Sequence, residues 1–250
     1  MINAIVDLNK YNTDMEKSMK DKIFFLDHIR TDDIDAIVDF GCANGALLDA
    51  MPKEWIKYGV DNNPDMKKIC EEKSYTVYNS LDEVKNPQTR TLLNMSSVLH
   101  EVYAYLTPEE IAHFWSKVFD GSYEYITIRD MMVSDNTNRP AEFNLLTNGA
   151  DKYIKSFVGR WVNGAATQHD LLHYLLKYKY TDNWARECNE DYLALSLEQL
   201  KVLIPERYTI IYEERYVLPY LKAQVFNDFG YTISDTTHAK LILKRRAKEE

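Results

Sequence analysis

The stretch AIVDFGCANGALL, from Ala36 to Leu48, constrains the fold more than any other part of the chain. It begins with a short, apolar, β-branched run of the kind expected of a buried strand, and a helix-forming segment rich in alanine and leucine follows. Gly41 and Gly45 stand where the backbone must turn sharply, and the lack of a Cβ lets a ligand come close there. We therefore predict a strand, a tight turn with free backbone N–H groups, and the start of a helix.

A second strand that ends in an acid follows this turn. The residues from Tyr58 to Val60 are typical of a short strand, and Asp61 comes directly after them, 22 residues beyond Asp39. This is close to the spacing of the ribose-binding acid in nucleotide-binding β-α-β units. Asp39 lies at the end of the first strand, two residues before Gly41. An acid at that place suits a positively charged ligand group better than a pyrophosphate.

Together these residues resemble the class I S-adenosylmethionine (SAM)-dependent methyltransferases, whose first motif runs Asp/Glu-x-Gly-x-Gly-x-Gly and whose second strand ends in an acid. Asp39, Gly41 and Gly45 occupy three of the four signature positions, and Ala43 replaces the middle glycine. The resemblance implies an α/β, Rossmann-like fold with a seven-stranded, mostly parallel sheet, helices on both faces and a helical insertion before the sixth strand. It also implies SAM as the cofactor.

The resemblance also assigns parts of the cofactor to residues at the ends of the strands. The methionine part would lie on Asp39 and the glycine-containing loop, the ribose on Asp61, and the adenine near Asn62 and Ser80. The cofactor-binding residues expected on this basis are Asp39, Gly41, Cys42, Ala43, Gly45, Asp61, Asn62, Ser80, Asn94 and Ser96.

Further strands are expected at 75–78, 91–97, 123–128, 207–212 and 238–243, and the last resembles the antiparallel seventh strand of the family. The triplet Asn63-Pro64-Asp65 predicts a helix start, since asparagine caps helices and proline fits the first turn. Residues 1–30 are expected to be helical. In the family such leading helices cover the cofactor, so Tyr11 and Met15 are lid candidates, although packing against the sheet is the preferred role.

The segment after the fourth strand, Val98-Leu99-His100-Glu101, resembles the Val-Leu-His-His segment of many small-molecule methyltransferases. His100 is the predicted general base, because the pKa of histidine lies near neutrality. Its alternative role is only to shape the cofactor pocket. Glu101 is expected to orient His100 or to bind substrate. Arg129 and Asp130 end the fifth strand over the same cleft, and we expect them to bind a charged substrate or to pair with each other.

The long segment 131–195 has helical patterns but no further nucleotide motif. Long connections in compact domains are often functional, so we expect substrate recognition there. Residues 1–130 would form the leading helices and the SAM-binding core, and 196–250 the rest of the core sheet. Arg160, His169 and His173 are the substrate-binding candidates in the insertion. The two histidines stand four apart on a predicted helix, but no third metal ligand follows at a recognisable spacing, so no metal site is predicted.

Composition narrows the choice of partners. The net charge of −9 argues against a general electrostatic grip on nucleic acid and leaves small or cationic substrates open. Cys42, Cys70 and Cys188 lie far apart without a CxxC pair, as expected in a reducing compartment. No signal peptide and no membrane-spanning apolar run is recognisable, so the expectation is a soluble cytoplasmic protein.

These observations predict SAM-dependent methyl transfer to an O or N atom of a small molecule, and two alternatives stay open. RNA or a nucleotide could be the acceptor, held by Arg160, Lys177, Lys179 and Arg186. The simpler interpretation of the lysines is an amphipathic helix whose tyrosines pack while its lysines stay in water. The second alternative, which Ala43 keeps open, is a catalytically inert SAM-binding protein with an interaction or regulatory role. The sequence determines neither the oligomeric state nor whether the insertion acts as a lid.

Overall fold

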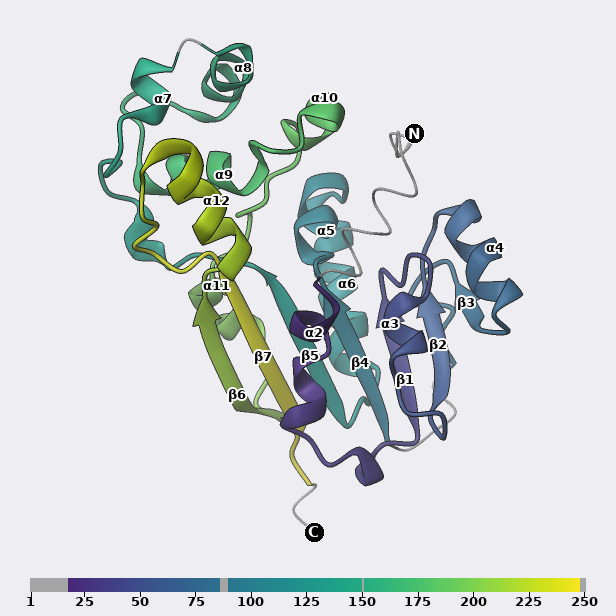
Figure 1. The fold of residues 1–250 in the computed structure, drawn as a ribbon. Helices are drawn as coiled ribbons and strands as arrows, with labels where there is room; N and C mark the ends of the chain where they lie inside the picture. Colours follow the sequence, from purple (N-terminus) through teal and green to yellow (C-terminus); the bar gives the residue numbers. More distant parts are fainter. Residues whose placement is uncertain (1–17, 86–89, 150, 248–250) are drawn as a thin grey trace.

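The computed structural model describes residues 18–85, 90–149 and 151–247. These residues form one seven-stranded sheet in the order β3-β2-β1-β4-β5-β7-β6, in which β7 runs antiparallel to both of its neighbours (Figure 1). The strands are β1 (Ala36–Phe40), β2 (Ile56–Val60), β3 (Thr76–Tyr78), β4 (Thr91–Ser96), β5 (Tyr125–Met131), β6 (Tyr208–Tyr216) and β7 (His238–Arg245). The predicted mostly parallel sheet with an antiparallel last strand is thereby confirmed, and β6 and β7 extend beyond their predicted ends.

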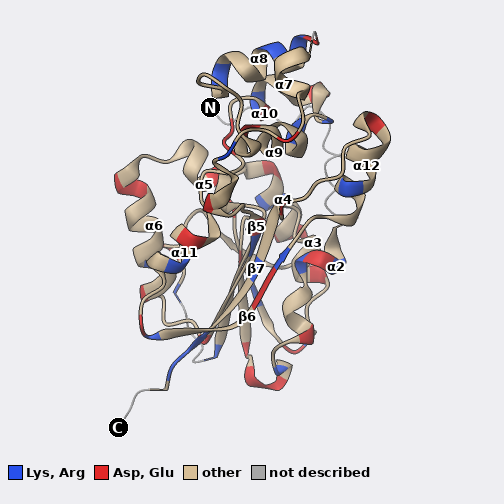
Figure 2. Ribbon diagram, turned by 90° about the vertical axis from the view of Figure 1, so that its left-hand side faces the viewer, with Lys and Arg blue, Asp and Glu red and all other residues tan. Residues whose placement is uncertain are grey.

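Helices cover both faces of this sheet (Figure 2). On one face lie α5 (Leu99–Tyr105), α6 (Pro108–Asp120) and α11 (Leu197–Leu203). On the other lie α2 (Met19–Lys22), the 3₁₀ helices η1 (Phe24–Asp27) and η2 (Thr31–Asp33), α3 (Ala46–Asp49) and α4 (Pro64–Glu72). Successive side chains of β4 point to opposite faces, so Leu93 joins the core with Phe114 while Leu92 joins the core with Phe25. Both faces of the sheet are therefore buried, as expected of a mostly parallel sheet.

A group of helices, here called the helical cap, lies beyond the carboxyl ends of the parallel strands (Figure 1). It consists of η3 (Asp135–Thr137), α7 (Leu145–Asn148), α8 (Lys152–Trp161), α9 (Gln168–Lys177), η4 (Thr181–Asn183), α10 (Trp184–Glu187) and α12 (Pro219–Phe229). Its apolar cluster joins Phe157 and Leu171 to Leu221 and Val225 of α12. The cap thus draws on the connection between β6 and β7 as well as on the predicted insertion 131–195, and the predicted boundary covers only part of it.

The beginning of the chain is only partly within the described residues. Tyr11 and Met15, the predicted lid candidates, lie outside them. From Ser18 onward the predicted helix is short, since α2 ends at Lys22 and the chain continues as a 3₁₀ helix. Apolar side chains of this segment pack against the sheet, with Phe24 buried and Leu26 partly buried in the core on that face. In the part of the chain that the structure describes, no helix is both long and apolar enough to cross a membrane.

The predicted start of α4 generates a stability test. The side chain of Asn63 accepts hydrogen bonds from the N–H groups of Asp65 and Met66, at 3.0 and 3.4 Å. Asn63→Ala removes this cap, so we expect the free energy of unfolding to fall by about 1 kcal/mol in urea denaturation. The control is Asn62→Ala, because the neighbouring Asn62 is exposed. Equal stability of the two variants would contradict the role of Asn63.

Candidate functional site

The loop between β1 and α3 has the tight backbone that its glycines predict. Gly41, Ala43 and Gly45 have φ values of 77°, 45° and 75°, all in the left-handed region. A Cβ on Gly41 would lie 2.7 Å from the Cγ2 atom of Val98, so a larger residue would push the loop away from the end of β4. Ala43 adopts the same kind of conformation at some cost in strain, and its side chain is buried.

Asp61 ties this loop to the end of β2. Its Oδ2 atom accepts a hydrogen bond from the N–H of Ala43 at 2.9 Å, and its Oδ1 atom accepts one from the N–H of Asn63 at 2.8 Å. Burial raises the pKa of Asp61, and the two N–H donors oppose this rise by favouring the charged carboxylate. The two predicted motifs therefore meet in space.

Asp39 is buried next to this loop and is held by a chain of side chains across the sheet. Asn94 on β4 donates from Nδ2 to Oδ1 of Asp39 at 2.7 Å, and Thr127 on β5 donates from its hydroxyl to Oδ1 of Asn94 at 2.9 Å. Burial raises the pKa of Asp39 to about 7, although Asn94 and the charge of Lys22 act in the opposite direction. Both polar atoms of Asn94, predicted to bind the cofactor, are thus engaged by protein groups, and Asn94 acts on the site by orienting Asp39.

A small cavity of about 20 Å³ lies between Asp39, the turn at Gly41, Lys22 and Ser96. Burial and the charge of Arg129 lower the pKa of Lys22 to about 8, while Asp39 raises it. The hydroxyl of Ser96 is buried and has no hydrogen-bond partner among the described residues. A volume of this size holds little more than a water molecule. Sequence reasoning missed Lys22, because nothing local shows that α2 lies against β1.

His100 begins the second predicted group, on α5. Its Nδ1 atom lies 3.0 Å from Oδ1 of Asp130, and the other oxygen of Asp130 accepts the N–H groups of Val98 and Leu99 at 2.8 and 2.7 Å. Burial lowers the pKa of His100, but the charge and hydrogen bond of Asp130, aided by Glu101, outweigh it and raise the pKa above its ordinary value. Asp130 therefore orients His100, which is one of the two roles predicted for Glu101.

Arg129 and Asp130 do not form the mutual pair that was one of the predicted options. The guanidinium of Arg129 is buried and forms its ion pair with Asp21, at 2.7 Å from Nη2 to Oδ2. It also donates to the hydroxyls of Tyr216 and Ser97. Since both side chains are engaged by protein groups, the structure gives no support to substrate binding by either residue.

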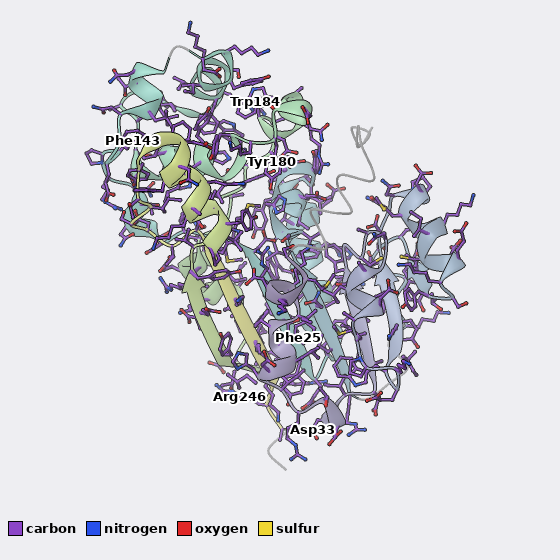
Figure 3. The ribbon with its side chains drawn as sticks, viewed as in Figure 1. Phe25, Asp33, Phe143, Tyr180, Trp184 and Arg246 are labelled. Carbon is purple, nitrogen blue, oxygen red and sulfur yellow. The ribbon has the colours of Figure 1, made fainter. Side chains whose placement is uncertain are left out.

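Glu101, on α5, instead connects the part of the chain that contains the sheet to the helical cap. Its Oε1 atom lies 2.8 Å from Nη2 of Arg186, and Nε of Arg186 lies 2.8 Å from Oε1 of Glu190. Tyr105 on α5 donates its hydroxyl to the same oxygen of Glu190 at 2.5 Å. Figure 3 shows Trp184 and Tyr180, which flank this part of the cap, on the side toward α5 and Phe143 on the opposite side. From the sequence, Arg186 is only an RNA-binding candidate, and no local pattern indicates Glu190.

His173 and Lys177 on α9 hold the segment that presents these groups. Nε2 of His173 accepts the N–H of Tyr192 at 3.1 Å, and burial lowers the pKa of His173 well below its usual value. Lys177 has no exposed surface and donates to the carbonyls of Glu187 and Glu190 at 2.8 and 2.6 Å. The expectation that Lys177 stays in water is wrong, because these carbonyls replace its hydration. His173 contacts protein groups in the same way and has no position from which to bind a substrate directly.

The remaining predicted residues are less closely connected to the site. Asn62 is exposed just after β2, and the carbonyl of Ser80 accepts a turn hydrogen bond after β3, so both stay predictions at the same sheet edge. Arg160 is on α8, at the end of the cap remote from the sheet, and lies over the ring of Trp161 at 5.2 Å (Figure 1). His169 is partly exposed, 6.4 Å from the ring of His173. No group of three metal-ligating side chains occurs within residues 18–85, 90–149 and 151–247.

A larger hollow of about 570 Å³ lies elsewhere, between α2, η1 and β6. The stacked rings of His28 and Tyr212, 3.8 Å apart, form part of its wall. None of the predicted site residues lines it. The candidate functional site therefore lies at the carboxyl ends of β1, β2, β4 and β5, where ligands bind in open α/β sheets.

The contact between His100 and Asp130 predicts a measurable pKa. In Asp130→Asn the imidazole loses its charged partner, so the pKa of His100, followed by NMR, falls toward or below 6.5. Glu190→Gln removes a weaker contributor and gives a smaller fall. Because the pKa of His100 is raised by folding, its stabilising effect is full below pH 6.5 and is lost as the pH rises through the folded-state pKa. The stability gap between wild type and Asp130→Asn therefore narrows over that range, and an unchanged His100 pKa would contradict the pairing.

The fold can be compared with known proteins. No family model and no curated protein matches the sequence. A solved SAM-dependent methyltransferase from Methanosarcina mazei matches with a TM-score of 0.51 at 14% identity, over 90% of this chain and 98% of that one. Another, from Archaeoglobus fulgidus, gives 0.49 at 16% identity over 94% and 100%. At such low identities a similarity is evidence of the fold alone, and here that evidence comes from the Methanosarcina structure, whose TM-score is 0.51. The chain has the α/β fold of the class I, Rossmann-like methyltransferases.

Proposed function

We propose that the chain is a SAM-dependent methyltransferase that transfers a methyl group to an O or N atom of a small molecule. The observation that carries this proposal is the hydroxyl of Ser96, buried without a partner among the described residues beside Asp39 and the turn at Gly41. Buried polar groups are almost always hydrogen-bonded, so an unpaired hydroxyl in a cavity is best explained by a ligand that completes it.

The charged groups around this cavity fit the amino acid end of SAM. Asp39 offers a carboxylate to the ammonium group, and Lys22 offers an ammonium to the carboxylate. Asp61, partly exposed at the end of β2, has oxygens that can accept the ribose hydroxyls in addition to its two backbone donors. The close approach that the left-handed glycines permit supports the same placement.

On the acceptor side, His100 is proposed as the general base. SAM, when bound, supplies a methyl group that is already activated on a sulfonium, so the chain has to position the acceptor and remove its proton. With Nδ1–H donated to Asp130, Nε2 of His100 keeps a lone pair for that proton. Asp130 is then a positioning residue. General-base catalysis of this kind contributes roughly 10²- to 10⁴-fold in rate.

The RNA alternative receives little support from the residues it was based on. Lys177 is buried, Arg186 is paired with two glutamates, and Lys179 pairs with Asp228 at 2.7 Å. Arg160 is exposed and forms no ion pair among the described residues, but its guanidinium donates to the carbonyl of Asn189 at 3.5 Å. An inert SAM-binding protein differs from the proposed enzyme in one outcome, which is affinity for the cofactor without methyl transfer to any acceptor.

The first test of the proposal is calorimetric titration with S-adenosylhomocysteine. We expect binding to the native protein, and an affinity about tenfold to a hundredfold weaker in Asp61→Asn, because hydrogen bonds to a charged carboxylate are lost. Asp65→Asn, an exposed neighbour on α4, serves as the charge-matched control and should bind like the native protein. Failure of the native protein to bind would refute the proposed function.

The hydroxyl of Ser96 gives a second test with two readouts. Ser96→Ala should leave the free energy of unfolding of the ligand-free protein unchanged or slightly higher, because no protein hydrogen bond is removed. The same variant should bind S-adenosylhomocysteine about threefold to tenfold more weakly. Ser97→Ala is the comparison, since the hydroxyl of Ser97 contacts Arg129 and its loss should lower stability. Native affinity in Ser96→Ala would contradict the placement of the ligand.

A further inference from the structure

The groups beside His100 indicate what kind of acceptor the site takes. We propose that the acceptor carries a positively charged group, a protonated amine, and that Glu101 binds this group next to His100. The inference rests on the proposed function for the location of the acceptor, at the carboxyl ends of β4 and β5 under the cap. It concerns recognition of the acceptor, and the methylated atom need not be the charged nitrogen itself.

The cations of this region are already used by protein groups. Arg186 is bound on one side by Glu101 and on the other by Glu190, each at 2.8 Å. Lys177 has no exposed surface and donates to two backbone carbonyls. His100 faces Asp130 through Nδ1. An anionic acceptor would therefore have to displace a glutamate from Arg186 before it found a counter-charge.

The carboxylates, in contrast, exceed the cations around His100. Asp130, Glu101 and Glu190 all act on the imidazole by their charge, and Arg186 is the guanidinium that Glu101 and Glu190 share. Arg186 contacts only the Oε1 oxygen of Glu101, whose side chain is still 38% exposed. Glu101 is therefore the carboxylate in this group that remains open to a ligand, whereas Glu190 and Asp130 are almost fully buried.

Two aromatic rings lie beside these carboxylates. The ring of Tyr192 stands 5.1 Å from that of His100, edge to face, and the exposed ring of Tyr105 ends in the hydroxyl bound to Glu190. A small aromatic or apolar body with an ammonium group fits this combination of rings and carboxylates.

Three probes that differ in the charge of one tail test the proposal. Tyramine, 4-(2-hydroxyethyl)phenol and 4-hydroxyphenylacetate share a phenol ring and carry an ammonium, a neutral hydroxyl and a carboxylate. Calorimetry on the full chain at pH 7, with and without saturating S-adenosylhomocysteine, should show that tyramine binds at millimolar concentration or better. We expect it to bind about tenfold more tightly than the neutral alcohol, with the carboxylate weakest.

Glu101→Gln assigns this preference to one residue. The variant should lose the preference for tyramine and gain affinity for the carboxylate probe, because Arg186 then keeps only Glu190 as its partner. The matched control is Glu198→Gln, since Glu198 is 37% exposed and pairs with Arg215 at 3.0 Å in the same way but lies on α11. The control should keep the native order of the three probes.

Several results would overturn the inference: no binding of tyramine, equal affinities for the three probes, a preference for the carboxylate, or a preference for tyramine that survives Glu101→Gln. The first three of these results are measured on the native protein, so the proposal can be overturned even if the variant fails to fold. Loss of S-adenosylhomocysteine binding with the charge preference intact would reject the proposed function but not the cationic site. The reverse result would reject only the cationic acceptor.

Discussion

The carboxylate of Asp130 is 1% exposed at the carboxyl end of β5, and a charge so deeply buried is tolerated only when it is fully hydrogen-bonded. Its partners are the N–H groups of Val98, Leu99 and Met131 and the ring of His100. These bonds attach the start of α5 to β5 and fix the orientation of the imidazole. Glu101 and Tyr105, which contact the cap, also lie on α5. The carboxylate of Asp130 therefore helps to position the contacts between α5 and the cap.

The cap reaches this helix through contacts between distant parts of the chain. Arg186 and Glu190 belong to the segment that His173 and Lys177 hold from α9, and α9 packs in a cluster with α12, which comes from between β6 and β7. A change in α12 can therefore affect the position of Arg186 although α12 contributes no group to the site. The cap therefore depends on two connections in the chain, one after β5 and one after β6.

How much of the fold and of the candidate site the sequence could predict depends on how far apart in the sequence the interacting residues lie. The turn at Gly41, the cap at Asn63 and the strand ends at Asp39 and Asp61 follow from local patterns, because strand periodicity, turn geometry and helix capping act over a few residues. Lys22 against Asp39, Asp130 against His100 and Arg186 against Glu101 join residues 17, 30 and 85 positions apart. No local pattern indicates such pairs, so Asp130 and Arg186 were predicted without their partners, Lys22 was missed, and the expectation that Lys177 stays in water was wrong.

Asp39 and Lys22 show what it costs to bury two opposite charges beside each other. Burial is the main cause that raises the pKa of Asp39 from 3.8 to about 7. The charged carboxylate therefore destabilises the folded state, and this effect grows as the pH rises from 3.8 to about 7 and is of the order of 4 kcal/mol above that range. Lys22, with its pKa lowered to about 8 by burial, carries a similar penalty below that pH. The charges of Asp39 and Lys22 attract each other, which partly offsets the burial penalty of both side chains. A ligand with both an ammonium group and a carboxylate would lower both penalties further, so the burial of these two side chains favours a zwitterionic ligand end over a neutral one at the proposed site.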